Sequence, residues 1–97
     1  MSLAKHAYQV VPAATPAKLG QTGARILRAV VIYGASAITK VEFKNGATDT
    51  GDVLLTLQTG DDVNSPYFDF SEFGIPFSTA IFCKPVGTDA IVHCWFD

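Results

Sequence analysis

The sequence predicts an all-β domain, an antiparallel β-sandwich of jelly-roll type with about seven to eight short strands. Turn-forming glycine, proline and asparagine residues recur at short intervals along the 97 residues. The segments between them are too short for ordinary helices and have the length of strands, and many are rich in β-branched residues or alternate apolar with polar ones. An immunoglobulin-like sandwich is the alternative, but its order of cysteine, tryptophan and cysteine is absent because Trp95 follows both cysteines.

The amino-terminal part, residues 1–23, is expected to hold one strand followed by an arm or loop. His6–Val11 is predicted as a strand that ends at Pro12, and because proline has no backbone donor, an edge position or a strand end fits. Ala13–Gly23 shows no clear period and is interpreted as a long crossing loop, or as an arm that contacts a neighbouring subunit. Residues 24–97 then form the sandwich core, and the whole chain is one domain.

The middle of the chain is expected to supply three strands. Ala24–Tyr33 is rich in β-branched residues. Ala37–Lys44 alternates an apolar face containing Val41 and Phe43 with a charged face, which predicts a strand with one wet side. After a loop at Asn45 and Gly46, the segment Asp52–Thr59 alternates again and is interpreted as a central strand.

The carboxyl-terminal part is expected to form a corner and a hairpin. In Pro66–Phe70 the alternation places Phe68 and Phe70 toward the core, and Gly74 and Pro76 then turn the chain, so that Phe77 and Phe82 return to the core. Thr79–Asp97 is interpreted as two strands about a turn near Val86–Asp89.

Charge and hydropathy argue against two classes of partner. Seven basic and nine acidic residues give a formal net charge of −2, and no run of lysine or arginine is present, so we expect no nucleic-acid partner. The uncharged stretches, such as Ala29–Thr39, are too short to span a bilayer, and the amino-terminal residues lack the pattern of a signal peptide. We therefore expect no membrane partner.

Cys83 and Cys94 are expected to be free thiols buried as small apolar groups. In the predicted terminal hairpin, a two-residue loop would place them diagonally, too far apart for an easy disulfide, whereas a longer loop, Gly87–Ala90, would place them directly opposite. A metal site made with His6 and His93 is not expected, because alternation sends His93 to the other face from Cys94.

We expect no enzyme and no cofactor. No serine or cysteine nucleophile can be tied to His93 by a recognisable turn, and the acidic residues fall mostly where turns require polar side chains. The scattered glycines form no phosphate-binding loop.

Aromatic residues are the remaining candidates for contact with a partner. The stretch YFDFSEFGIPFSTAIF, residues 67–82, holds five of the seven phenylalanines of the chain, which favours burial in the core or a subunit interface over ligand binding. Tyrosine and tryptophan tolerate water better, so Tyr33, Tyr67 and Trp95 are the candidate interface or ligand-contact residues. A ligand-binding module would expose these rings together with Tyr8 beside a carboxylate or amide.

Two runs, AITKVEFKNGATDTGDVLLTLQTG (37–60) and DFSEFGIPFSTAIFCKPVGTDAIVHCWF (69–96), resemble a recurring type of small bacteriophage protein. In that type a strand ending in DG or NG leads to VLLTL, then to FGIPFSTGIY or a close variant, and then to a terminal GTDA hairpin. The resemblance covers approximately residues 24–97. The cysteines and the pair Lys84 and Pro85 depart from the pattern.

The resemblance implies a β-sandwich protein of the virion, some members being regarded as virion components, with no catalytic position to carry over. The expected function is that of a non-enzymatic capsid- or tail-associated subunit that forms a homo-oligomer, with a trimer as the expected state. Its expected partners are its own copies and other virion proteins. The alternative is a β-sandwich module that binds a glycan or another ligand on the host surface.

Overall fold

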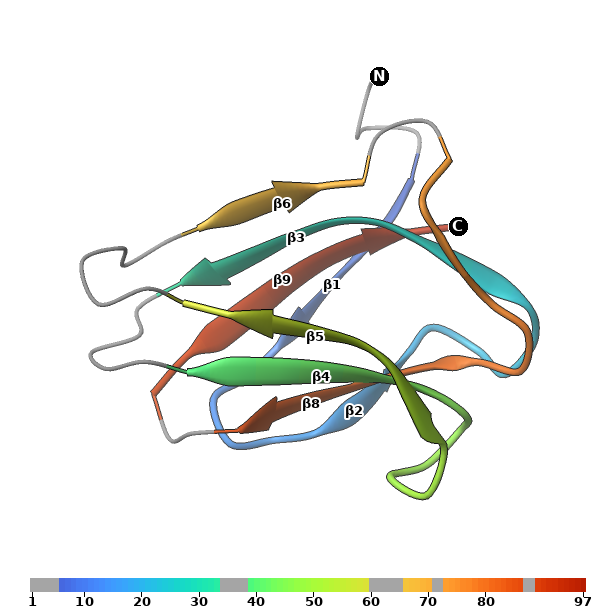
Figure 1. Ribbon diagram of the computed structural model, residues 1–97, viewed down its shortest axis with the longest axis horizontal. Helices are drawn as coiled ribbons and strands as arrows, with labels where there is room; N and C mark the ends of the chain where they lie inside the picture. The colour runs from blue at the N-terminus through green and yellow to red at the C-terminus, as the bar shows by residue number, and fades with distance from the viewer. Residues whose placement is uncertain (1–5, 34–38, 60–65, 71–72, 87–88) are drawn as a thin grey trace.

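The chain folds into two antiparallel β-sheets. The computed structural model describes residues 6–33, 39–59, 66–70, 73–86 and 89–97, and no described residue is helical. Sheet A has the strand order β1-β9-β3-β6, with β7 also paired to β3, and sheet B has the order β2-β8-β4-β5. Figure 1 shows β6, β3, β9 and β1 side by side, and β5, β4, β8 and β2 likewise. Among the described residues, no helix is long and apolar enough to cross a membrane.

The strands of the described residues are short and number nine, slightly more than expected. Every pairing between them is antiparallel. Their bounds are β1 Ala7–Val11, β2 Ala17–Leu19, β3 Arg25–Tyr33, β4 Lys40–Asn45, β5 Asp52–Gln58, β6 Tyr67–Asp69, β7 Ile75–Phe77, β8 Ile81–Val86 and β9 Ile91–Phe96.

One apolar cluster joins the two sheets. Strand alternation points every second side chain of each sheet inward, and these side chains from both sheets make a single contiguous core. Val41 and Phe43 of β4 are fully buried and Lys40 is exposed, as the alternation predicts, but Lys44, expected on the wet side, is buried. The largest fully buried side chains are Phe43, Phe77, Leu19, Leu27, Ile32 and Ile81.

The predicted terminal hairpin is wrong. β8 pairs with β2 and β4 in sheet B, whereas β9 pairs with β1 and β3 in sheet A. The chain passes from one sheet to the other across residues 87–88, which lie outside the described residues. Both arrangements considered for Cys83 and Cys94 within a hairpin are therefore wrong, and the two thiols lie in different sheets. Local turn chemistry marks where a chain reverses but not which strand it then joins.

Three segments differ from expectation in smaller ways. The stretch 13–23, expected as a loop or arm, contains β2, whose Leu19 is fully buried. β5, expected as a central strand, is the last strand in the order of sheet B, and its Leu54 is 49% exposed. Phe82, expected in the core, lies on the outer side of β8, because its neighbours Ile81 and Cys83 occupy the inward positions.

Gly74 turns the chain between Phe70 and β7, and we expect Gly74→Ala to destabilise the fold. Its φ of 65° lies in the left-handed region, and an added Cβ would come within 2.4 Å of Ile26 Cγ2 and 2.9 Å of the Leu27 carbonyl oxygen. We expect a loss of about 2 kcal/mol in the free energy of unfolding, since backbone strain at such a site costs about 1–3 kcal/mol. Urea unfolding followed by circular dichroism measures it.

Gly23→Ala is the matched control, because Gly23 also has a positive φ, 138°, but nothing lies within 4 Å of an added Cβ. Equal losses at the two positions would contradict the steric part of the explanation for Gly74.

Candidate functional site on the outer face of sheet A

The outer face of sheet A gathers the tyrosines and the tryptophan of the chain. In one row across the sheet, Tyr8 of β1 is opposite Trp95 of β9, which is opposite Ala29 of β3, which is opposite Asp69 of β6. In the next row, the residues are Val10, His93, Val31 and Tyr67. Opposed residues of paired strands point to the same face, and Tyr33, two residues beyond Val31, shares that face.

The sequence has three tyrosines and one tryptophan, and all four therefore lie on this face, which we call the aromatic face. Its members are Tyr8, Tyr33, Tyr67, His93 and Trp95, with Val10, Val31 and Ile91 between them. Tyr8, Tyr33 and Tyr67 are 51%, 56% and 51% exposed, while His93 and Trp95 are half-buried. The phenylalanines at 43, 77 and 96 are buried in the core instead.

Ring contacts hold four of these side chains together. Tyr8 lies against Trp95 with ring centroids 5.1 Å apart and stacks on His93 at 5.9 Å. Tyr33 meets the edge of the same imidazole at 6.4 Å. The Tyr8 hydroxyl and His93 Nδ1 share a hydrogen bond of 2.5 Å across the β1–β9 pair. The rings are therefore ordered before any partner arrives, which reduces the entropy lost on binding.

The aromatic face carries the three candidate contact residues, Tyr8, which the ligand-binding alternative also named, and His93, which sequence reasoning did not propose as a contact residue. Tyr33, Tyr67 and Trp95 all lie on it, from three different strands. His93 was not proposed as a contact residue, because its partner Tyr8 lies 85 residues away in sequence. The alternation of His93 with Trp95 along one strand is the signal that places His93 on the same face.

An ion-paired cluster lies at the end of sheet A. His6 Nδ1 donates to Asp97 Oδ1 at 2.6 Å, and Arg28 Nε donates to Asp97 Oδ2 at 2.8 Å. Burial by itself raises the pKa of the Asp97 carboxyl, but the hydrogen bonds from His6 and Arg28 outweigh it and hold the pKa below its ordinary value. Asp97 is therefore a carboxylate at neutral pH, and its two oxygens are already hydrogen-bonded to His6 and Arg28 of the same chain.

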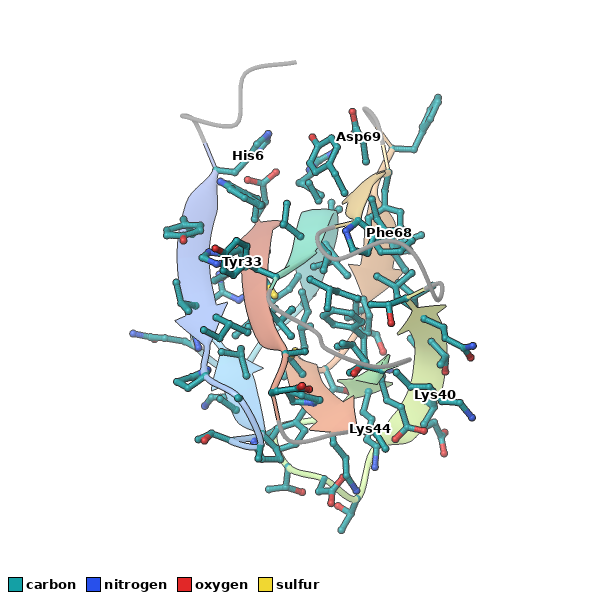
Figure 2. The ribbon with its side chains drawn as sticks, turned by 90° about the vertical axis from the view of Figure 1, so that its left-hand side faces the viewer. His6, Tyr33, Lys40, Lys44, Phe68 and Asp69 are labelled. Carbon is teal, nitrogen blue, oxygen red and sulfur yellow. The ribbon has the colours of Figure 1, made fainter. Side chains whose placement is uncertain are left out.

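The outer face of sheet B carries more charged residues, although Phe82 and Val86 of β8 also lie on it. Its exposed and half-buried positions include Lys18, Lys40, Glu42, Thr56, Gln58 and Lys84. Figure 2 shows Tyr33 with β1 and β9 on one side of the molecule and Lys40 and Lys44 on the other. A charged, well-hydrated surface resists burial against another protein, whereas tyrosine and tryptophan are enriched in protein interfaces. The two outer faces therefore differ in their capacity to dock a partner.

Asp49 ties two lysines of sheet B together, and this network predicts a pH effect. Lys44 Nζ donates to both the carboxylate and the backbone carbonyl of Asp49, and Lys84 Nζ donates to Asp49 Oδ2 at 3.0 Å. Hydrogen bonds from Lys44 and Lys84 lower the pKa of Asp49 below 3.8. A carboxyl whose pKa is lower in the folded than in the unfolded state stabilises the fold above the unfolded pKa, and this stabilisation is lost as the pH falls through the folded pKa.

We therefore expect the thermal midpoint of the wild-type chain to exceed that of Asp49→Asn at pH 6, and the difference to shrink as the pH falls below 3.8. Melting curves of both proteins between pH 6 and pH 2.5 measure it. A difference that stays constant over this range would contradict the ionic origin of the effect.

A cleft of about 520 Å³ lies apart from the aromatic face, where the start of β3 meets β7 and the end of β4. Ile26, Leu54, Pro76 and Phe77 line it with apolar atoms, and Asp97 and other polar groups contribute a smaller share. Its carboxylate is the one already paired with His6 and Arg28. The cleft therefore offers an apolar surface whose carboxylate is already engaged by His6 and Arg28.

Comparison of the chain with protein-family models and with curated protein sequences finds no match. The aromatic face thus stands as a candidate site on its geometry alone. Flat, ordered and half-exposed rings can pack against another protein or stack on the apolar faces of sugar rings.

Proposed function

We propose that the protein is a non-enzymatic bacteriophage structural protein, a capsid- or tail-associated subunit that forms a homotrimer through the aromatic face. It is made in the host cytoplasm and functions in the virion, where other virion proteins contact the assembled subunits. The likeness of residues 37–60 and 69–96 to small phage proteins supports the origin. The composition of the aromatic face supports the mode of assembly.

We infer that the two sheets are those of a jelly roll. The pairs β1·β9, β2·β8, β3·β6 and β4·β5 are nested from the ends of the chain toward its middle, as in a long antiparallel ribbon rolled into two sheets. A jelly roll has eight strands in two four-stranded sheets, and viral capsid domains use this fold. Here β7 is an additional short strand that pairs with β3, the strand with which β6 also pairs. This fold supports the proposal by analogy only.

The segregation of residue types between the outer faces carries the assembly proposal. All the tyrosines and the tryptophan lie on the outer face of sheet A, and the lysines at 18, 40, 44 and 84 belong to sheet B. Interface cores are depleted in lysine and enriched in tyrosine and tryptophan, which often dominate the binding energy. A protein whose function is assembly needs such a surface, and one that works alone does not.

Size-exclusion chromatography with light scattering tests the proposal over a wide range of protein concentration. The expected mass is three times the 10.4 kDa of one chain, falling toward the monomer on dilution. A monomer mass at the highest concentrations would overturn the proposal of self-assembly.

A glycan-binding module for the host surface is the second candidate, and the exposure of the tyrosines favours it. Had these rings been buried, this function would have been excluded, but Tyr8, Tyr33 and Tyr67 are each about half exposed, and Asp69 lies two residues from Tyr67 on the same face of β6. Exposed aromatic rings beside polar groups are typical of carbohydrate sites.

Trp95, the only tryptophan, reports on this second candidate. Titration with host-type oligosaccharides is expected to change its fluorescence in a saturable way if the aromatic face binds sugars. An unchanged emission at millimolar saccharide would remove this candidate and leave the assembly proposal intact.

A further inference from the structure

Cys83 and Cys94 are the reactive groups that the proposed function does not use. Both are free thiols and both are completely buried. Cys83 lies on β8, an interior strand of sheet B, and Cys94 lies on β9, an interior strand of sheet A. The chain holds no other cysteine, so any disulfide within one molecule joins these two.

The pairing registers place both thiols in the core between the sheets. Cys83 is opposite Phe43 and Ala17, and Cys94 is opposite Val30 and Gln9. Both cysteines belong to the same buried apolar cluster, and the neighbouring Cys83 thiol together with burial raises the pKa of the Cys94 thiol well above its ordinary value. Two thiols of one buried cluster, one from each sheet, resemble the arrangement of a disulfide between the sheets of a sandwich.

We propose that Cys83 and Cys94 are a disulfide-forming pair, which a small-molecule disulfide such as oxidised glutathione closes across the core. A thiolate of the pair attacks one sulfur of the reagent, whose S–S bond breaks and releases one small thiolate. The second protein thiolate then attacks the protein sulfur of the mixed disulfide, which forms the Cys83–Cys94 bond and releases the second small thiolate. Two electrons pass from the protein thiols to the reagent, and the two protons end on the released thiols.

Burial sets the rate of this reaction rather than its outcome. The first exchange needs a locally opened molecule, because neither sulfur is exposed in the closed fold. The raised pKa of Cys94 makes its thiolate rare in the closed state, which also slows attack. The second exchange is favoured because both cysteines belong to one core cluster, so the remaining thiol lies near the mixed disulfide. A bond of about 2.05 Å then draws β8 and β9 together.

The experiment is to incubate the native chain with oxidised glutathione, at mildly alkaline pH, and to follow intact mass and free thiols. The expected product is a monomeric chain lighter by two hydrogen atoms, with no retained glutathione and no thiol open to alkylation after unfolding. Its thermal midpoint is expected to rise by about 10 °C or more, because the bond closes the segment between residues 83 and 94 and so lowers the entropy of the unfolded chain.

Cys83→Ser and Cys94→Ser are the matched controls, each expected to keep one glutathione as a mixed disulfide. If either serine variant fails to fold, the intact mass and free-thiol content of the oxidised native chain still test the proposal. Two retained glutathiones, a covalent dimer, or two thiols still free under conditions that oxidise the urea-unfolded chain would each overturn the proposal. An oxidised chain with an unchanged or lower midpoint would overturn the geometry inferred for the pair.

Discussion

Replacing Phe43 with alanine is expected to lower the free energy of unfolding by about 3–5 kcal/mol. Phe43 is fully buried and lies on β4 between β5 and β8, opposite Leu55 on one side and Cys83 on the other. Truncation removes its apolar surface from the core and leaves a cavity, because the neighbouring strands are held by their ladders and cannot collapse onto the space. Domains of this size have a total stability of about 5–15 kcal/mol, so the variant is expected to be marginal.

Urea unfolding of the two proteins measures this loss, with Phe73→Ala as the matched control. Phe73 carries the same side chain but is 87% exposed, and surface substitutions usually change stability by about 0.5 kcal/mol or less. Equal losses at the two positions would contradict the assignment of Phe43 to the core.

The double substitution of Tyr33 and Tyr67 by serine is expected to weaken self-association by about 30-fold or more. The two rings are exposed and sit on β3 and β6 at the centre and edge of the aromatic face. Interface residues of this type cost at least about 2 kcal/mol when they are truncated, and each 1.4 kcal/mol is tenfold in Kd. The stability of the monomer is expected to change little, since neither side chain belongs to the buried core.

Light scattering over a dilution series measures the change in Kd. Lys40→Ser, on the exposed outer side of sheet B, is the control and is expected to associate like the wild-type chain. Tyr8→Phe keeps the ring and removes the hydroxyl that meets His93, so it separates the effect of ring packing from that of the hydrogen bond. An association unaffected by the double substitution would place the contact on another surface.

Local patterns predicted the side-chain directions better than the connections between strands. The alternation around Val41 and Phe43 identified a strand and its buried side, because the period of a strand is a property of adjacent residues. Phe68 and Phe70 pack against the core while Tyr67 and Asp69 are exposed, again as the alternation predicts. The alternation in Asp52–Thr59 also indicated a strand, but an edge and a central strand share this pattern, so the exposure of Leu54 was not foreseen.

The long-range pairings could not be predicted in the same way. β1 pairs with β9, at the far end of the chain, whereas β8 and β9, which are consecutive in sequence, lie in different sheets. No local turn signal encodes either arrangement. These pairings build the aromatic face, since Tyr8 reaches His93 and Trp95 only across β1 and β9. Sequence reasoning could therefore name Tyr33, Tyr67 and Trp95 as water-tolerant rings but could not bring them together.

The fluorescence of Trp95 during dilution, with the mass of each sample fixed by light scattering, tests most directly whether the aromatic face forms the subunit contact. Trp95 is the only tryptophan and lies on that face beside Tyr8, so its emission reports the burial of the face alone. The predicted result is a shift to longer wavelength over the same concentrations at which the mass falls to that of one chain. A fall in mass with no change in emission would place the contact elsewhere, and a single-chain mass at every concentration would contradict assembly itself.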